Sequence, residues 1–310
     1  MLTKCLLFLL LPAIAYSRIK IKIIPGKTAD DVSVDFSGSD TSVISDKERK
    51  TFRLNDENLK SAAEKYKGKR CDDVFVKPPT PWGNVYSQYN WDIVMRTVKP
   101  VKARVLGVQS KPVAVATAEY VNNHNKIDVS YSTSVTQQVE ETVEHTWSVG
   151  GELTMGQDIT YSINFGAGSA GGTTSLSYTS NWGEDTTESR TVTLGTTSSV
   201  ITTIPPGQRV VAVLSASQGT LEVEVDYEAT LNNGDVFCNY AATYKNHHFY
   251  AFPLRRLQNL QNLTKKVRTT EKISVGFYSS ARIEVNNGTT EEEIQEAPAG
   301  IIDVGPQKEV

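Results

Sequence analysis

The chain has 310 residues, of which 39% are hydrophobic and 22% are charged, so it can bury a core and is not disordered in bulk. The formal net charge of −3 gives no electrostatic reason to expect a nucleic-acid partner. Ser and Thr are abundant, and Val, Ile and Tyr recur at every second position, a pattern that favours β-structure.

The first residues have the features of a secretion signal. Lys4 supplies a short positive region, residues 6–14 are apolar, and Ala13-Ile14-Ala15 is a small-residue cleavage pattern. The apolar run is too short to span a bilayer as a helix. We therefore predict a signal peptide over residues 1–17 and a secreted, soluble mature protein.

Two cysteines, Cys71 and Cys238, would remain after removal of the signal. In an oxidising compartment they predict one disulfide, and two buried free thiols are the alternative. Asn262 and Asn287 each begin a triplet that can accept an N-linked glycan. The sequence therefore predicts a glycoprotein.

The segment that follows the signal predicts a small α+β head domain over residues 18–121. Residues 18–24 alternate like a short strand, and residues 55–69 carry apolar side chains at helical spacing with Gly68 near the stop. A proline-rich elbow then leads into an aromatic cluster: Trp82, Tyr86, Tyr89 and Trp91. We predict that this cluster is a carbohydrate or receptor surface, and an aromatic core is the alternative.

From Ile127 onward the pattern is that of very long strands. Odd positions are mostly apolar and the gaps mostly polar as far as Phe165, a run of about forty residues where strands usually have five or six. A return leg of the opposite parity ends at Pro205-Pro206-Gly207. We then expect a shorter hairpin over residues 209–229 with its turn at Gln218-Gly219.

Within this region, residues 151–182 predict an amphipathic hairpin that inserts into a membrane. A membrane β-strand needs about 9–11 residues with apolar and polar side chains in alternation, and Gln157 alone interrupts the apolar face of the first strand. The predicted lipid-facing residues are Leu153, Met155, Ile159, Tyr161, Ile163, Phe165, Leu176, Tyr178 and Trp182. The predicted tip is small and uncharged, and contains Gly166, Gly168, Gly171 and Gly172. Since open strand edges cannot lie in lipid, several copies would have to close into one barrel.

No catalytic or metal-binding arrangement survives inspection. The glycines at 166, 168 and 171 fit G-x-G-x-x-G, but the residues after them alternate like a strand, whereas a dinucleotide site needs a helix there. The four histidines are not at metal-ligand spacing, so we expect them at the surface or in clefts. Glu140 and Glu141 read as charges on a solvated strand face. We predict no enzyme activity, no cofactor and no metal.

Residues 122–227 resemble the aerolysin-like β-pore-forming family, in the branch of clostridial epsilon toxin and the mosquitocidal toxins. The resemblance consists of two Ser/Thr-rich alternating tracts around an amphipathic hairpin, followed by Ile204-Pro205-Pro206-Gly207 and a Val-rich strand. It implies a mainly β, elongated architecture of long twisted antiparallel strands, with residues 122–288 as the pore-forming module.

The resemblance also implies a function. A soluble monomer would bind a target membrane through an unidentified receptor, for which a glycan is one candidate, and would assemble into a homo-oligomeric pore. The acidic tail, residues 289–310, is a candidate for a terminal peptide removed by proteolysis, with Arg282 as the upstream cut site; a solvated tail is the alternative. The alternative function is a non-lytic secreted binding or structural protein on the same scaffold, for example an extracellular, egg or storage component.

Overall fold

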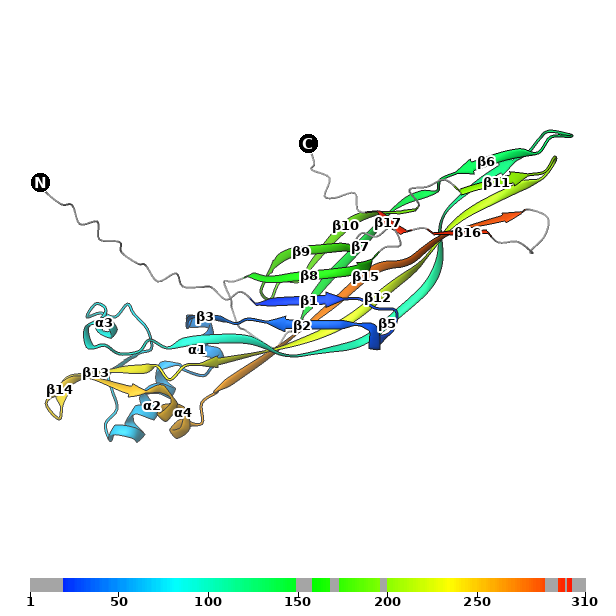
Figure 1. The fold of residues 1–310 in the computed structure, drawn as a ribbon. Coiled ribbons are helices and arrows are strands. Elements are labelled where there is room, and N and C mark those ends of the chain that lie inside the picture. The colour runs from blue at the N-terminus through cyan, green and yellow to red at the C-terminus, as the bar shows by residue number, and fades with distance from the viewer. Residues whose placement is uncertain are drawn as a thin grey trace, which may run out of the picture.

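A computed structural model describes residues 19–148, 158–167, 173–195, 200–287, 295–298 and 300–302. The predicted signal peptide and most of the predicted tail lie outside these ranges, as do Leu153, Met155, Gly168, Gly171 and Gly172. The molecule is elongated, with the α-helices gathered at one end and strands β6 and β11 at the other (Figure 1).

The helices are short, and none of those described is both long and apolar enough to cross a membrane. They are η1 (Ala29–Asp31), α1 (Asp46–Thr51), α2 (Asp56–Lys67), α3 (Val85–Tyr89) and α4 (Leu254–Gln261). Helix α2 confirms the predicted helix: the Asn55 side chain accepts a hydrogen bond from the Asn58 amide at its start, and Gly68 adopts φ 88° at its end.

Strands make up most of the rest of the described chain. In order they are β1 (Lys20–Ile24), β2 (Ser33–Ser37), β3 (Asp40–Val43), β4 (Asp73–Phe75), β5 (Met95–Val121), β6 (Val129–Thr133), β7 (Thr136–Trp147), β8 (Asp158–Ala167), β9 (Thr173–Asn181), β10 (Thr186–Gly195), β11 (Val200–Ile204), β12 (Arg209–Leu231), β13 (Asp235–Tyr244), β14 (His247–Pro253), β15 (Lys266–Asn287), β16 (Gln295–Pro298) and β17 (Gly300–Ile302).

Three long strands, β5, β12 and β15, form the axis of the molecule. They pair antiparallel within an eight-stranded sheet of order β17-β10-β7-β15-β12-β5-β3, in which β16 also pairs with β15. The elongated, mainly β fold class predicted from the sequence is confirmed.

The hairpin predicted within residues 209–229 is wrong, because β12 continues through Gln218-Gly219 as one strand. Gly219 serves close packing instead of a turn. A Cβ atom at this position would clash with a ring carbon of Phe277 on the neighbouring strand β15. The absence of a side chain therefore lets the Phe277 ring lie against the backbone of β12.

The helical end of the molecule, called the head, is assembled from two separate segments, whereas the sequence predicts a head over residues 18–121. Helices α1 to α4 gather around a three-stranded sheet of order β14-β13-β4, which combines residues from before β5 with residues from after β12. Strands β1 and β2 lie beside the long sheet instead, and β5 is part of it (Figure 1). The chain enters the head twice because β5 and β12 are antiparallel and both have one end there.

A buried ion cluster joins the head to the long sheet. Arg96 on β5 is 2% exposed and bonds two carboxylates, Asp40 on β3 and Glu48 on α1, the latter through Nε to Oε1 at 2.8 Å. A buried charge is tolerated only when it is paired and hydrogen bonded, as it is here.

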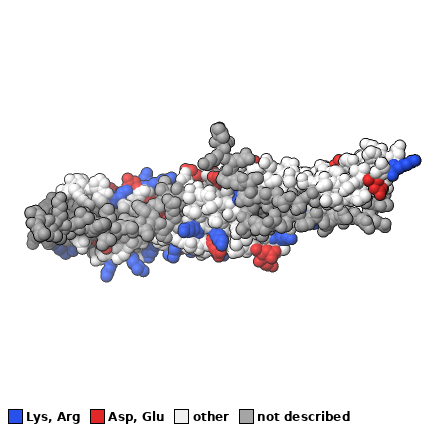
Figure 2. Space-filling model, turned by 45° about the horizontal axis from the view of Figure 1, so that its top comes forward, with Lys and Arg blue, Asp and Glu red and all other residues white. Residues whose placement is uncertain are grey.

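Charged side chains of both signs occur along the face shown in Figure 2, and much of the described surface toward β6 and β11 is uncharged except at the tip. This distribution agrees with the small net charge and with the Ser/Thr-rich sequences of those two strands.

Candidate functional site

Strands β8 and β9 form the predicted amphipathic hairpin. Tyr161 pairs with Tyr178 and Ile163 with Leu176, so these apolar side chains share one face of the antiparallel pair. Ser162 pairs with Ser177, and these polar side chains share the other face. The alternation in the sequence therefore corresponds to a real division of the hairpin into two faces.

The apolar face of this hairpin packs against the long sheet and is buried. Ile159, Tyr161, Ile163 and Phe165 are at most 5% exposed and belong to the same core cluster as residues of β12 and β15. Leu176 and Tyr178 on β9 are half-buried and pack against that cluster.

Trp182, at the base of the hairpin, is also buried. Its ring lies 4.5 Å from that of Trp147 on β7 and 4.7 Å from that of Tyr227 on β12, measured between centroids. In this form of the protein Trp182 is therefore a core residue. Its role as an interfacial anchor remains a prediction about the inserted state.

One edge of the hairpin is covered by the N-terminal strand. β1 pairs parallel with β8, with Ile21 opposite Tyr161, and the sheet order is β2-β1-β8-β9. Ile19, Ile21 and Ile23 are all buried. The sequence indicates β1 as a strand but not its partner, because pairing between parallel strands far apart in the chain has no local signal.

The tracts that flank the hairpin pair with each other. β7 pairs antiparallel with β10, and β6 with β11, so the chain returns along its own path on both sides of β8–β9. The long alternation from Ile127 is therefore divided among β6, β7 and β8 and is not one continuous strand. Along the chain, the β8–β9 hairpin therefore lies between strands that pair with each other, β7 with β10 and β6 with β11.

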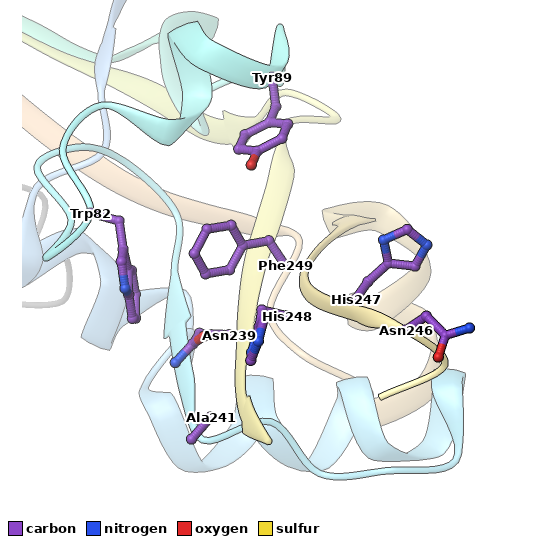
Figure 3. A pocket seen from close by; sticks show the side chains of 8 residues that line it. All are labelled: Trp82, Tyr89, Asn239, Ala241, Asn246, His247, His248 and Phe249. Atoms are coloured by element: carbon purple, nitrogen blue, oxygen red, sulfur yellow. The ribbon is translucent and has the colours of Figure 1, made fainter. Parts of the chain in front are cut away.

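The head contains a pocket of about 570 Å³ at its surface. Its lining combines aromatic rings with amide and imidazole groups: Trp82, Tyr89, Asn239, Ala241, Asn246, His247, His248 and Phe249 (Figure 3). Trp82 and Tyr89 are 40% and 45% exposed, and the centroids of the Trp82 and Phe249 rings are 5.2 Å apart. Exposed aromatic faces beside polar groups suit a ligand with both apolar and hydroxylated surfaces.

The predicted aromatic surface is thus divided by the fold. Tyr86 is 1% exposed and donates its hydroxyl to the carbonyl of Phe75 at 2.8 Å, so its assignment to a receptor surface is wrong. Burial raises the pKa of Tyr86 well above its usual range. Trp91 is half-buried and does not line the pocket; its ring stacks on that of Tyr89 with the centroids 4.8 Å apart.

Two polar residues expected at the surface are buried. His145 on β7 is 1% exposed, and Glu141 on the same strand is fully buried. His247 and His248, by contrast, lie at the pocket. In the part of the chain that is described, no group of His, Cys, Asp and Glu residues is arranged to hold a metal ion.

Cys71 and Cys238 are both buried and are present as free thiols, in contrast to the predicted disulfide. They are neighbours, since a hydrogen bond between the two side chains lowers the pKa of Cys71, while burial raises that of Cys238. Of the two predicted glycan acceptors, Asn262 is exposed at the end of α4, and Asn287 is the last residue of β15. Glycosylation at both remains a prediction.

An elongated sheet protein with a small head and an amphipathic hairpin folded onto its body has the fold of the aerolysin-like β-pore-forming toxins. Residues 82–295 match the family model described as Clostridium epsilon toxin ETX/Bacillus mosquitocidal toxin MTX2, and the chain belongs to this family.

Relatives and a solved structure agree with this assignment. U-megalopygitoxin(8)-Mc8 of Megalopyge crispata is 37% identical over 262 residues, which cover 84% of this chain and 89% of that protein. U-megalopygitoxin(8)-Mo12 of Megalopyge opercularis is 36% identical with the same coverage. Parasporin-2, a Bacillus thuringiensis toxin that recognizes cancer cells, has a TM-score of 0.61 and 17% identity, covering 84% of this chain and 100% of its own. At that identity the likeness shows the fold alone.

Proposed function

We propose that the protein is a secreted pore-forming toxin whose soluble form binds a target membrane, assembles into a ring and inserts the β8–β9 hairpin. The observation that carries this proposal is the hairpin itself, which has one apolar and one polar face and is stored with its apolar face covered. Its strands have 10 and 9 described residues, which matches the length of about 9–11 residues that crosses a bilayer.

Assembly follows from the geometry of a single hairpin. In the soluble form one edge of β8 is satisfied by β1, which would be lost when the hairpin leaves. Unpaired backbone groups cost several kcal/mol each in the hydrocarbon region, so neighbouring copies must supply the missing partners. The proposed membrane form is therefore a homo-oligomeric barrel, with one hairpin contributed by each chain.

For receptor recognition we propose the head pocket. A sugar ring has an apolar face that can lie on an aromatic side chain, and hydroxyl groups that can bond amides such as that of Asn246. The exposed rings of Trp82 and Tyr89 provide the aromatic part of this surface. A glycan on the target cell is accordingly the proposed ligand class.

A reversible staple tests hairpin insertion. Lys22→Cys with Ser162→Cys places two cysteines at paired positions of β1 and β8, at a spacing that a disulfide can bridge. The oxidised variant should fail to release dye from liposomes or red cells and should recover on reduction. The control, Lys22→Cys with Asp35→Cys, joins β1 to β2 without touching the hairpin and should remain active when oxidised.

Release by the oxidised hairpin staple would contradict insertion of β8–β9. Wild-type protein that stays monomeric and releases no dye from either membrane, with or without limited trypsin, would support the non-lytic alternative.

The head pocket is tested by binding to susceptible cells. Trp82→Ala and Tyr89→Ala should each reduce cell binding about tenfold or more while the protein stays folded, because both rings are partly exposed. Tyr66→Ala is the matched control, since Tyr66 is 39% exposed on α2 and does not line the pocket. Equal losses for Tyr66→Ala and Trp82→Ala would argue against a specific site.

A further inference from the structure

A buried polar cluster lies where the stored hairpin meets the body of the protein. Its centre is Glu271 on β15, which is fully buried, and His145 on β7, which is 1% exposed. His145 Nδ1 and Glu271 Oε1 are 2.7 Å apart. Both residues belong to strands of the long sheet that pair with each other.

The hairpin contributes two tyrosines to this cluster. The Tyr161 hydroxyl donates to Glu271 Oε1 at 2.5 Å, and the Tyr178 hydroxyl lies 2.5 Å from His145 Nε2. Tyr161 and Tyr178 are cross-strand partners in β8–β9, and their rings stack with centroids 5.3 Å apart. The two sides of the imidazole–carboxylate pair are therefore each joined to a different strand of the hairpin.

The body contributes a third tyrosine to the same carboxylate. Tyr227 on β12 donates its hydroxyl to Glu271 Oε2 at 2.6 Å. The raised pKa of Tyr227, caused by burial and by the nearby Glu271 charge, keeps this hydroxyl protonated as a donor. A buried carboxylate is costly unless donors surround it, and here Tyr161 and Tyr227 supply one donor to each oxygen.

Because of this cluster, the hairpin contacts the body through hydrogen bonds as well as through apolar side chains. If hydrophobic burial alone held β8–β9, the buried carboxylate would lower the stability of the folded protein without stabilising the position of the hairpin. Lifting the hairpin removes Tyr161 from Glu271 and Tyr178 from His145, whereas the bonds among His145, Glu271 and Tyr227 remain within the body. Within this cluster, the hydroxyls of Tyr161 and Tyr178 are the groups that connect the hairpin to the body.

We infer that Glu271 and His145, with Tyr161 and Tyr178, form a polar latch that holds the hairpin on the body of the soluble protein. In this latch Glu271 accepts the hydrogen bond of Tyr161 and is bonded to His145, which in turn bonds Tyr178. The inference rests on the proposed release of β8–β9, and it adds the residues that control that release. Loss of the Tyr161 hydrogen bond to the carboxylate should raise the population of the open hairpin about tenfold to a hundredfold. Loss of the Tyr178 hydrogen bond to the imidazole should raise it about twofold to tenfold.

Hydrogen exchange of the soluble protein without membranes tests the latch separately from pore formation. Tyr161→Phe and Tyr178→Phe keep the rings and remove only the hydroxyls. Exchange of the β8–β9 amides should therefore accelerate by the factor given for each bond, while β12 and β15 keep their protection. The matched control is Tyr227→Phe, which removes a donor to the same carboxylate from the body and should not act selectively on β8–β9. Glu271→Gln, which removes the charge at nearly constant size, should loosen the hairpin as the two hairpin variants do.

Unchanged exchange in β8–β9 for both hairpin variants would overturn the latch. Equal acceleration across β12, β15 and the hairpin would overturn it as well, because it would show a general loss of stability. Dye release then separates the two proposals: a wild-type protein that never forms pores refutes the proposed function, while the exchange result stands or fails independently.

Discussion

Two adjacent residues of β9 offer a direct test of which hairpin face meets lipid. Leu176 is half-buried on the apolar face opposite Ile163, and Ser177 is exposed on the polar face opposite Ser162. Leu176→Arg and Ser177→Arg introduce the same charge one residue apart on opposite faces. If β8–β9 inserts as proposed, the first arginine would face hydrocarbon and the second the water-filled lumen.

Leu176→Arg should cost less free energy in the structure described than in the proposed membrane form. In the soluble form the leucine is half-buried, so its loss costs about 1 kcal/mol, roughly half the value for full burial. In the bilayer an arginine near the midplane costs about 2–4 kcal/mol. That cost corresponds to about 30-fold to 1000-fold per chain in the insertion equilibrium, and it recurs for every chain in the ring.

The assay is dye release from liposomes, accompanied by the unfolding midpoint of each soluble variant. Leu176→Arg should abolish release while the protein remains folded, and Ser177→Arg should stay close to wild type. The reasoning is refuted if Ser177→Arg blocks release as strongly as Leu176→Arg, or if Leu176→Arg leaves release unchanged. Ile163 is unsuitable for this test, because it is fully buried and Ile163→Arg would unfold the soluble form.

Three further predictions concern the stability of the soluble form. Gly219→Ala should lower the free energy of unfolding by about 1–3 kcal/mol because its Cβ would meet the Phe277 ring, whereas Gly107→Ala, with nothing within 4 Å, should change it by about 0.5 kcal/mol or less; urea denaturation distinguishes the two. Arg96→Met leaves two buried carboxylates without their cation and should cost about 3–5 kcal/mol in the same assay, and a loss below about 1 kcal/mol would contradict the burial. Tyr227 has a pKa raised above its ordinary value of 10.0, so its contribution to stability is complete below pH 10 and is lost as the pH rises through the higher value in the folded protein. Tyr227→Phe should therefore flatten the alkaline loss of stability measured by thermal unfolding, and an unchanged alkaline profile would count against this role.

Much of the architecture could be predicted because its signals are local. Alternation with period two places Tyr161 and Ile163 on one face of a strand, and the structure confirms that face in the β8–β9 hairpin. The helix over residues 56–67 likewise follows from apolar spacing and a terminal glycine. The same local patterns were misleading where a turn signal had another cause, as at Gly219, which accommodates Phe277.

The sequence by itself determined that the protein is built from long alternating strands and carries a hairpin with one apolar and one polar face, because the side-chain period of a strand is written in consecutive residues. Only the tertiary structure decided that β1 covers the edge of β8, that Tyr86 is core while Trp82 opens onto a pocket, and that His145 and Glu271 meet behind the hairpin. These contacts join residues far apart in the chain, for example Lys20 and Thr160, which are 140 positions apart. They depend on how strands pair and pack in space, for which single residues carry no signal.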